Sequence, residues 1–277
     1  MLHAALPRER RERFARQLVL PEFGPSGQAA LGRASMLVVG AGGLGAPVIA
    51  YLAGAGLGRL GIVEPGSVAV SDLHRQIVYR TEDVGRQKAP LAAAWAAAVD
   101  PDLDVAAWPT AFTPANGREL VRDFDVVIDA TDNPASRYLV SDACVLEHRP
   151  LVFGAVSRLE GQVARLAHDG APCYRCMHPE PPPPASVPSC AEVGVLGPVA
   201  GTIGAWMALE AIRWVTDLGV SAPAGLLHLD LSTWTQQRVV LERRALCAIC
   251  GDEPTIHQLE LEQAACLAGE PYPGGMP

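Results

Sequence analysis

Three short clusters of charged and polar side chains have the composition that chemistry on a nucleoside triphosphate requires. They are the segments 71–76, 85–88 and 129–133. Attack of a carboxylate on the α-phosphate of ATP needs positive charge around the phosphates, and Arg75 and Lys88 can supply it. Hydride transfer at a nucleotide site needs none of this charge. The clusters therefore predict ATP-dependent activation of a carboxylate.

The third cluster also offers a ligand for magnesium, which the leaving pyrophosphate needs. Mg²⁺ prefers a carboxylate and few other protein ligands, so Asp132 is the predicted ligand, with Asn133 beside it in the nucleotide site. The cluster follows a buried strand, and ligands bind at the carboxyl ends of strands in open α/β sheets. The simpler interpretation is a pair of solvated cations and an Asp132 that caps the helix beginning at Pro134.

A glycine-rich segment, residues 40–45, satisfies the pattern GxGxxG between an expected strand and an expected helix. Gly40, Gly42 and Gly43 allow a tight turn and a close approach of the backbone to phosphate, and the helix N-terminus attracts negative charge. Glu64 ends the next strand, where a carboxylate can bind ribose hydroxyls. On its own this pattern fits NAD as well as ATP, and a glycine-rich turn without a ligand is the simplest interpretation.

Four cysteines form two CxxC pairs that can hold a metal ion. Cys173 and Cys176 form the first pair, and Cys247 and Cys250 form the second. Four thiolates complete the tetrahedral coordination of a structural Zn²⁺, and the long separation of the pairs would pin the end of the chain to its core. A redox-active CxxC is the alternative for one pair alone. A closed four-cysteine site has no open coordination position, so no catalytic role is assigned to it.

Cys190 stands apart from these pairs, directly after a proline-rich segment at 180–188 that is expected to be an exposed loop. A thiol there could accept an acyl or sulfur group, or it could be an ordinary surface cysteine. The cysteine count is seven, and the arginine-rich start of the chain has no apolar leader. We expect a cytoplasmic, reduced protein.

The elements that position these residues alternate between strand and helix. Strands are expected at 35–39, 60–63, 104–108, 125–130 and 151–155, and helices at 44–55, 87–99, 117–122 and 134–147. Such alternation predicts an α/β, Rossmann-like fold, in which helices cover both faces of a mostly parallel sheet. Further strands are expected at 161–167, 226–231 and 237–242, with a long helix at 198–217. We expect these last strands to form a mixed or antiparallel region that the four-cysteine zinc site clamps.

The chain is long enough for one large α/β domain. The charged segment 7–17 is expected to be helical. We expect a single domain at 1–251 and a tail at 252–277. The domain would comprise an N-terminal helix or arm at 1–30, a nucleotide-binding core at 31–155 and a zinc-clamped part at 156–251.

The formal net charge of −8 argues against a nucleic acid or an anionic membrane as a partner. The uncharged stretch 38–58 is long enough for a membrane span. Its glycines and its proline are better explained by the strand, loop and helix around the GxGxxG motif. No membrane segment is therefore expected.

Taken together, these residues resemble the MoeB/ThiF family. Its members, the HesA/MoeB/ThiF adenylyltransferases, are bacterial relatives of ubiquitin-activating enzymes and adenylate the C-terminal glycine of a ubiquitin-like sulfur-carrier protein. The resemblance runs from about Arg13 to Gly251. It rests on the segment 13–17, the glycine loop, 71–76, Lys88, 131–133, 161–162, both cysteine pairs and 190–195.

The resemblance implies roles for individual residues. Gly43 would lie against the nucleotide, Glu64 would bind the ribose, and Asp132 would hold Mg²⁺. Arg16 resembles an arginine that reaches the triphosphate of the other subunit of a homodimer. Cys190 matches a cysteine that some members use covalently. The residues expected around the phosphates are Ser71, Asp72, Arg75, Gln76 and Lys88.

Three positions depart from the family pattern. Glu64 replaces the usual Asp at the ribose position, and Gly66 stands where a second acidic residue is expected. Asp72 replaces the Asn that usually follows the serine. Its negative charge near the phosphates opposes ATP binding unless Mg²⁺ or Arg75 offsets it.

The sequence therefore predicts an ATP-dependent adenylyltransferase that activates a carrier protein ending in Gly-Gly, with Mg²⁺ and a structural Zn²⁺. No rhodanese-like segment is found, so sulfur is expected from a separate donor protein. Three alternatives stay open: activation of a peptide or tRNA-base carboxylate, a non-catalytic scaffold that has lost ATP chemistry, and an NAD dehydrogenase. The carrier and its pathway are not named by the sequence; molybdopterin, thiamine and cysteine synthesis, tRNA thiolation and secondary metabolism all fit.

Overall fold

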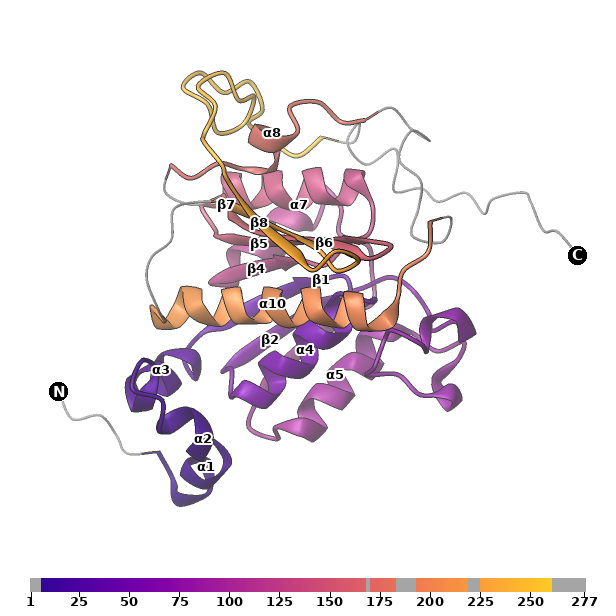
Figure 1. The fold of residues 1–277 in the computed structure, drawn as a ribbon, viewed down its shortest axis with the longest axis vertical. Coiled ribbons are helices and arrows are strands. Elements are labelled where there is room, and N and C mark those ends of the chain that lie inside the picture. Colours follow the sequence, from indigo (N-terminus) through magenta and orange to yellow (C-terminus); the bar gives the residue numbers. More distant parts are fainter. Residues whose placement is uncertain (1–5, 168–169, 183–192, 219–224, 261–277) are drawn as a thin grey trace, which may run out of the picture.

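One continuous sheet of eight strands forms the centre of the molecule (Figure 1). The computed structural model describes residues 6–167, 170–182, 193–218 and 225–260. The strands lie in the order β3-β2-β1-β4-β5-β6-β7-β8. Their bounds are β1 Ser35–Val39, β2 Arg59–Val63, β3 Asp104–Trp108, β4 Val126–Asp129, β5 Leu151–Ser157, β6 Glu160–Leu166, β7 Gly225–Asp230 and β8 Thr235–Val240.

Strands β1 to β5 run parallel, and helices cover both faces of this half (Figure 1). Consecutive residues of β1 face two different hydrophobic cores. Met36 and Val38 pack with residues of α4, α5 and α10, whereas Leu37 and Val39 pack with residues of α6 and α7. Burial on both faces explains why these strands are continuous apolar runs in the sequence. The helices are α4 Gly45–Ala55, α5 Lys88–Val99, α6 Gly117–Arg122, α7 Pro134–Leu146 and α10 Gly197–Thr216.

The other half of the sheet is antiparallel. Strands β5, β6, β7 and β8 pair antiparallel in that order. Helix α10 packs against β5, β6 and α4, so it joins the two halves. The predicted fold class, a parallel α/β sheet followed by an antiparallel C-terminal region, is confirmed.

The N-terminal segment differs from the single helix expected at 7–17. It forms α1 Arg8–Arg13 and α2 Ala15–Leu18, which are separated at Phe14. The Phe14 side chain is 2 % exposed, and a Cβ added at Gly56 would lie 2.4 Å from its ring. The ring at the break is thus buried beside Gly56, a tertiary contact that the local sequence pattern does not reveal.

Four short elements are not predicted by the sequence pattern. They are α3 Gly24–Leu31, η1 Val70–Asp72, η2 Thr81–Asp83 and α8 Tyr174–Met177. Cys190, most of the proline-rich loop at 180–188 and the tail beyond residue 260 lie outside the described residues. Within the described ranges, no helix combines the length and the apolar character that crossing a membrane would demand.

Candidate functional site

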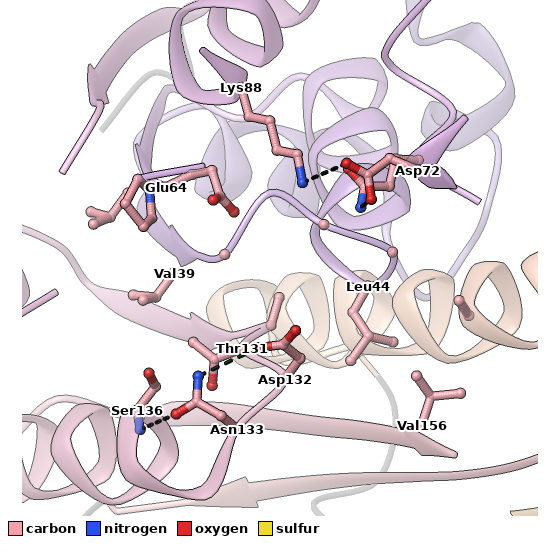
Figure 2. A pocket seen from close by; sticks show the side chains of 18 of the residues that line it. Val39, Leu44, Glu64, Asp72, Lys88, Thr131, Asp132, Asn133, Ser136 and Val156 are labelled. Atoms are coloured by element: carbon pink, nitrogen blue, oxygen red, sulfur yellow. Dashed lines mark hydrogen bonds and ion pairs between the residues drawn. The ribbon is translucent and has the colours of Figure 1, made fainter. Parts of the chain in front are cut away.

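A cavity of about 480 Å³ lies at the carboxyl ends of β1, β2 and β4, where ligands bind in open α/β sheets (Figure 2). Its lining draws on the glycine loop and on all three polar clusters. Figure 2 shows Glu64, Asp72 and Lys88 on one side and Asp132 and Asn133 on the other. The sheet thus brings together side chains that are far apart in the sequence.

Close backbone contacts explain the composition of the glycine loop. Gly40 has a φ of +96°, and a Cβ there would lie 2.7 Å from the carbonyl oxygen of Ala130. A Cβ at Gly45, the first residue of α4, would lie 1.9 Å from the carbonyl oxygen of Gly40. The loop can close in this way only with glycine at both positions. Gly42 and Gly43 line the cavity between them, so the backbone is open to a ligand.

Glu64 follows β2 and reaches back to the glycine loop. Its Oε2 accepts a hydrogen bond from the backbone N–H of Ala41 at 2.8 Å, and its Oε1 accepts one from the N–H of Gly66 at 2.7 Å. Both bonds come from backbone, so the carboxylate has a fixed place in the cavity wall. The predicted ribose ligand therefore lines the cavity, and its binding role stays a prediction.

Asp72 is 6 % exposed and contacts three of the side chains predicted to bind phosphate. Lys88 Nζ lies 2.9 Å from Asp72 Oδ2 (Figure 2). Arg75 Nη2 and Gln76 Nε2 donate to Oδ1 at 3.2 and 2.8 Å. The negative charge that the sequence places near the phosphates is thus paired with two cations, and it orients them before any nucleotide binds.

Asp72 is ionised at neutral pH. Burial is the largest influence on it and favours the protonated form. The backbone N–H of Ala69, at 3.0 Å from Oδ2, and the cations of Lys88 and Arg75 act in the opposite direction and together prevail. They hold the pKa of Asp72 below its ordinary value of 3.8.

Asn133, and not Asp132, caps helix α7. Asn133 Oδ1 accepts a hydrogen bond from the backbone N–H of Ser136 at 2.9 Å (Figure 2). Asp132 is exposed and lines the cavity, with Asn133 Nδ2 at 3.4 Å from its Oδ1. The capping interpretation of Asp132 is therefore wrong. Its carboxylate belongs to the cavity wall, where a magnesium ligand would be needed.

Asp129, in the same cluster, has a different environment. It is 1 % exposed, and its Oδ1 accepts hydrogen bonds from the backbone N–H and the hydroxyl of Thr131 at 2.9 and 2.6 Å. Burial raises the pKa of Asp129 above its ordinary value of 3.8. Asp129 therefore shapes the turn after β4, and Asp132 is the carboxylate of this cluster that reaches the cavity.

Phe112 and Arg137 also line the cavity, and neither residue is predicted from the sequence. Phe112 follows β3 at the same edge of the sheet and is 5 % exposed. Arg137 Nη2 lies 3.4 Å from the carbonyl oxygen of Thr131, and its guanidinium lies 5.6 Å from the centroid of the Phe153 ring. The signal for Arg137 in the sequence is its position four residues after Asn133, because residues at that spacing share one face of a helix.

Two predicted residues lie outside the cavity lining, and the structure does not describe a third. Ser71 is exposed, and its carbonyl oxygen accepts a hydrogen bond from Arg75 Nη1 at 2.6 Å, but Ser71 is not part of the cavity lining. Arg16 is exposed on α2 and is also outside this lining. Cys190 lies outside the described residues, so its role stays a prediction.

The two cysteine pairs meet in space. The Sγ atoms of Cys173, Cys176, Cys247 and Cys250 all lie within 4.8 Å of one another. The distance is 3.5 Å from Cys173 to Cys247 and 3.4 Å from Cys176 to Cys250. Zn–S bonds of about 2.3 Å in a tetrahedron place sulfur atoms roughly 3.8 Å apart. The four thiols therefore fit a closed structural zinc site.

The first cysteine pair, carried by α8, docks on α7. Arg175 Nε and Nη2 donate to Asp142 at 2.9 and 2.8 Å, and these two side chains are 6 % and 0 % exposed. The backbone N–H of Tyr174 donates to Ser141 Oγ at 3.1 Å. The cysteine cluster is thus attached to the same helix whose N-terminus borders the cavity.

Two named relatives align with almost the whole length of this chain. A sulfur carrier protein adenylyltransferase of Thermus thermophilus is 46 % identical over 264 residues, which cover 94 % of this chain and 97 % of that protein. The mouse adenylyltransferase and sulfurtransferase MOCS3 is 45 % identical over 264 residues, covering 95 % of this chain and 57 % of the mouse protein. The chain therefore spans little more than half the length of the mouse relative.

Solved structures share the fold at low sequence identity. E. coli MccB superposes with a TM-score of 0.76 and 18 % identity, over 90 % of this chain and 75 % of that chain. PaaA superposes with a TM-score of 0.74 and 20 % identity, over 88 % of this chain and 77 % of that chain. The ThiF family model matches residues 14–249, which include the cavity lining and three of the four clustered cysteines. On this match and on the identity to the Thermus thermophilus protein, the chain belongs to the ThiF family.

Proposed function

We propose that this protein uses ATP to adenylate the C-terminal glycine carboxylate of a ubiquitin-like sulfur-carrier protein. The observation that carries the proposal is the single cavity in which the glycine loop, the cations Arg75 and Lys88, and the carboxylate of Asp132 converge. The name of the Thermus thermophilus relative, a sulfur carrier protein adenylyltransferase, supports this substrate. The continuous sheet supports treating 1–251 as one adenylation domain, with 252–277 as a tail.

In the proposed reaction, a carboxylate oxygen of the carrier attacks the α-phosphorus of ATP. The bond from this phosphorus to the bridging oxygen breaks, and pyrophosphate leaves with the bonding electrons. Lys88 and Arg75 stabilise the charge that develops, and the N-terminus of α4 holds the phosphates. Glu64 orients the ribose. Asp132 would hold Mg²⁺, which neutralises phosphate charge when it is bound.

The proposal includes a homodimer in which Arg16 of one subunit reaches the phosphates bound by the other. Arg16 is exposed on α2 and is not part of the cavity lining of its own subunit. A shallow groove on α4 and α10 is lined by Tyr51, Trp206 and Leu209, and the first and last are 59 % and 43 % exposed. Large apolar side chains that are exposed together mark protein interfaces. They support a second copy of the chain as the partner.

A separate protein is proposed as the sulfur donor, with Cys190 as the residue that accepts an acyl or sulfur group. The name of the Thermus thermophilus relative, a sulfur carrier protein adenylyltransferase, supports sulfur transfer through a carrier protein. The cytoplasm is the proposed location, because a reducing compartment preserves the thiolates that a zinc site needs.

Exchange of labelled pyrophosphate into ATP, measured against a panel of carriers ending in Gly-Gly, tests the function. We expect exchange that requires Mg²⁺ and one of the carriers, and none with that carrier after removal of its last glycine. Absence of exchange with every carrier would overturn the proposal. Parallel calorimetric titrations with ATP and NAD separate the alternatives: NAD binding without ATP binding indicates a dehydrogenase, and binding of neither indicates a scaffold.

A further inference from the structure

The Glu64 side chain, and not the backbone conformation, explains why residue 66 is a glycine. Unlike Gly40 and Gly85, Gly66 does not adopt a positive φ, so its backbone is open to any residue. A Cβ added at Gly66 would nevertheless lie 2.8 Å from Oε1 of Glu64 and 3.8 Å from Cδ of Lys88. The first distance is too short for a contact between carbon and oxygen. The space that a side chain would need at position 66 is thus occupied by the Glu64 carboxylate.

Two backbone N–H groups donate hydrogen bonds to the Glu64 carboxylate, one to each oxygen. Gly66 N–H donates to Oε1 at 2.7 Å, and Ala41 N–H, in the glycine loop, donates to Oε2 at 2.8 Å. A carboxylate offers about four lone-pair positions, so each oxygen keeps one for a ligand in the cavity. Two oxygens with one acceptor position each match the two neighbouring hydroxyl groups of a ribose, each of which donates one hydrogen bond.

We propose that Gly66 is a specificity-determining residue, because it lets the longer Glu64 place both carboxylate oxygens against the 2′- and 3′-hydroxyls of the nucleotide. This inference rests on the proposed function, in which the cavity binds ATP. A side chain at position 66 displaces the end of a flexible glutamate and leaves the backbone as it is. A shorter carboxylate at position 64 would withdraw from position 66 and tolerate a side chain there. The two positions are therefore coupled.

Gly66 also connects the ribose side of the cavity to the phosphate side. Its carbonyl oxygen accepts a hydrogen bond from the backbone N–H of Lys88, the first residue of α5, at 2.9 Å. Lys88 Nζ in turn lies 2.9 Å from Asp72. An effect confined to the ribose contact should leave the phosphate contacts intact, and that separates the proposed role from general damage to the site.

Calorimetric titration of the zinc-loaded protein with ATP, 2′-deoxy-ATP, 3′-deoxy-ATP and inorganic triphosphate tests the proposal. We expect the wild type to bind ATP roughly tenfold or more tightly than either deoxy analogue, because each analogue lacks one hydrogen bond to a charged acceptor. Gly66→Ala should lose most of this preference and bind triphosphate as the wild type does. Gly54→Ala is the matched control, since a Cβ there meets no atom within 4 Å, and it should behave as the wild type.

Two further variants test the coupling between positions 64 and 66. Glu64→Asp combined with Gly66→Ala should bind ATP more tightly than Gly66→Ala alone. Glu64→Gln, which keeps Gly66, should also lose the preference for ATP over the deoxy analogues. If Gly66→Ala does not fold, this variant still tests the contact between residue 64 and the ribose hydroxyls. A Gly66→Ala protein that keeps the full preference for ATP over both deoxy analogues would overturn the inference. A wild type that binds no ATP would instead overturn the proposed function.

Discussion

Replacement of Asp72 by Asn tests how the charge of the cavity governs nucleotide binding. The ionisable side chains in its lining are three cations and three carboxylates, namely Arg75, Lys88, Arg137, Glu64, Asp72 and Asp132. With all of them ionised their charges cancel, whereas ATP is a polyanion. Asp72→Asn gives the lining a net positive charge with little change of shape. We therefore expect the variant to bind ATP more tightly than the wild type.

The geometry sets the size of this effect. Asp72 Oδ2 lies 2.9 Å from Lys88 Nζ. A phosphate oxygen bound on the far side of Nζ would add about 3 Å, so the two negative charges stand roughly 6 Å apart. Their repulsion is about 3 kcal/mol at an effective dielectric constant near 20 and about 0.7 kcal/mol in water. The variant should therefore bind ATP between about 3-fold and 100-fold more tightly.

Calorimetric titration with ATP, with and without added Mg²⁺, measures the effect. The gain should be largest without Mg²⁺, because the metal neutralises part of the phosphate charge that Asp72 repels. Asp132→Asn is the matched control: it removes the same charge at the predicted magnesium ligand, so it should weaken binding that depends on Mg²⁺. Weaker binding by Asp72→Asn at every Mg²⁺ concentration would refute the electrostatic reasoning. Asp72 would then act mainly by holding Arg75 and Lys88 in place.

Elemental analysis of the purified protein should find about one zinc ion per chain, and Cys247→Ser should lose the metal and unfold at a lower temperature; a metal-free protein of unchanged stability would contradict the site. Arg16→Ala should slow pyrophosphate exchange at least about tenfold while sedimentation still shows a dimer, and unchanged kinetics would remove its assigned role. The hydrogen bond from Arg122, with that from Arg118, holds the pKa of Glu147 below its ordinary value of 4.5. The stability from this pairing is therefore present above that pH and is lost as the pH falls through the lower folded-state pKa. Glu147→Gln should flatten the acid limb of the unfolding free energy, measured by denaturation at a series of pH values, and identical acid limbs would argue against the pairing.

The regular part of the fold is predictable because the signals are local and repeated. Each parallel strand is an apolar run buried on both faces, and each helix between strands has its own start, such as Pro134 for α7. The break at Phe14 is different. The Phe14 ring lies beside Gly56, far along the chain, and no pattern near residue 14 encodes that contact.

The candidate site is predictable as a set of residues but not as a network of contacts. The positions of Glu64, Lys88 and Asp132 at one edge of the sheet can be predicted, because the strands that precede them in the sequence are parallel. The sequence places the negative charge of Asp72 near the phosphates and offers Arg75 to offset it, but the pairing with Lys88 depends on side-chain directions that spacing does not give. In the sequence, Gly66 is notable only because an acidic residue is expected at that position. The structure shows that its backbone N–H donates a hydrogen bond to Glu64.

Helix α7 connects the candidate nucleotide cavity to the candidate zinc site. Its capping residue, Asn133, lies in the cavity wall, and Asp142, further along the helix, holds the Arg175 of the cysteine cluster. A ligand that binds only the folded state stabilises that state, and the stabilisation grows with the logarithm of one plus the ratio of ligand concentration to dissociation constant. Two ligands that stabilise one helix are therefore linked, and the factor by which each favours the other is the same in both directions. Bound zinc would then raise the apparent affinity for nucleotide, and bound nucleotide would raise the apparent affinity for zinc by the same factor.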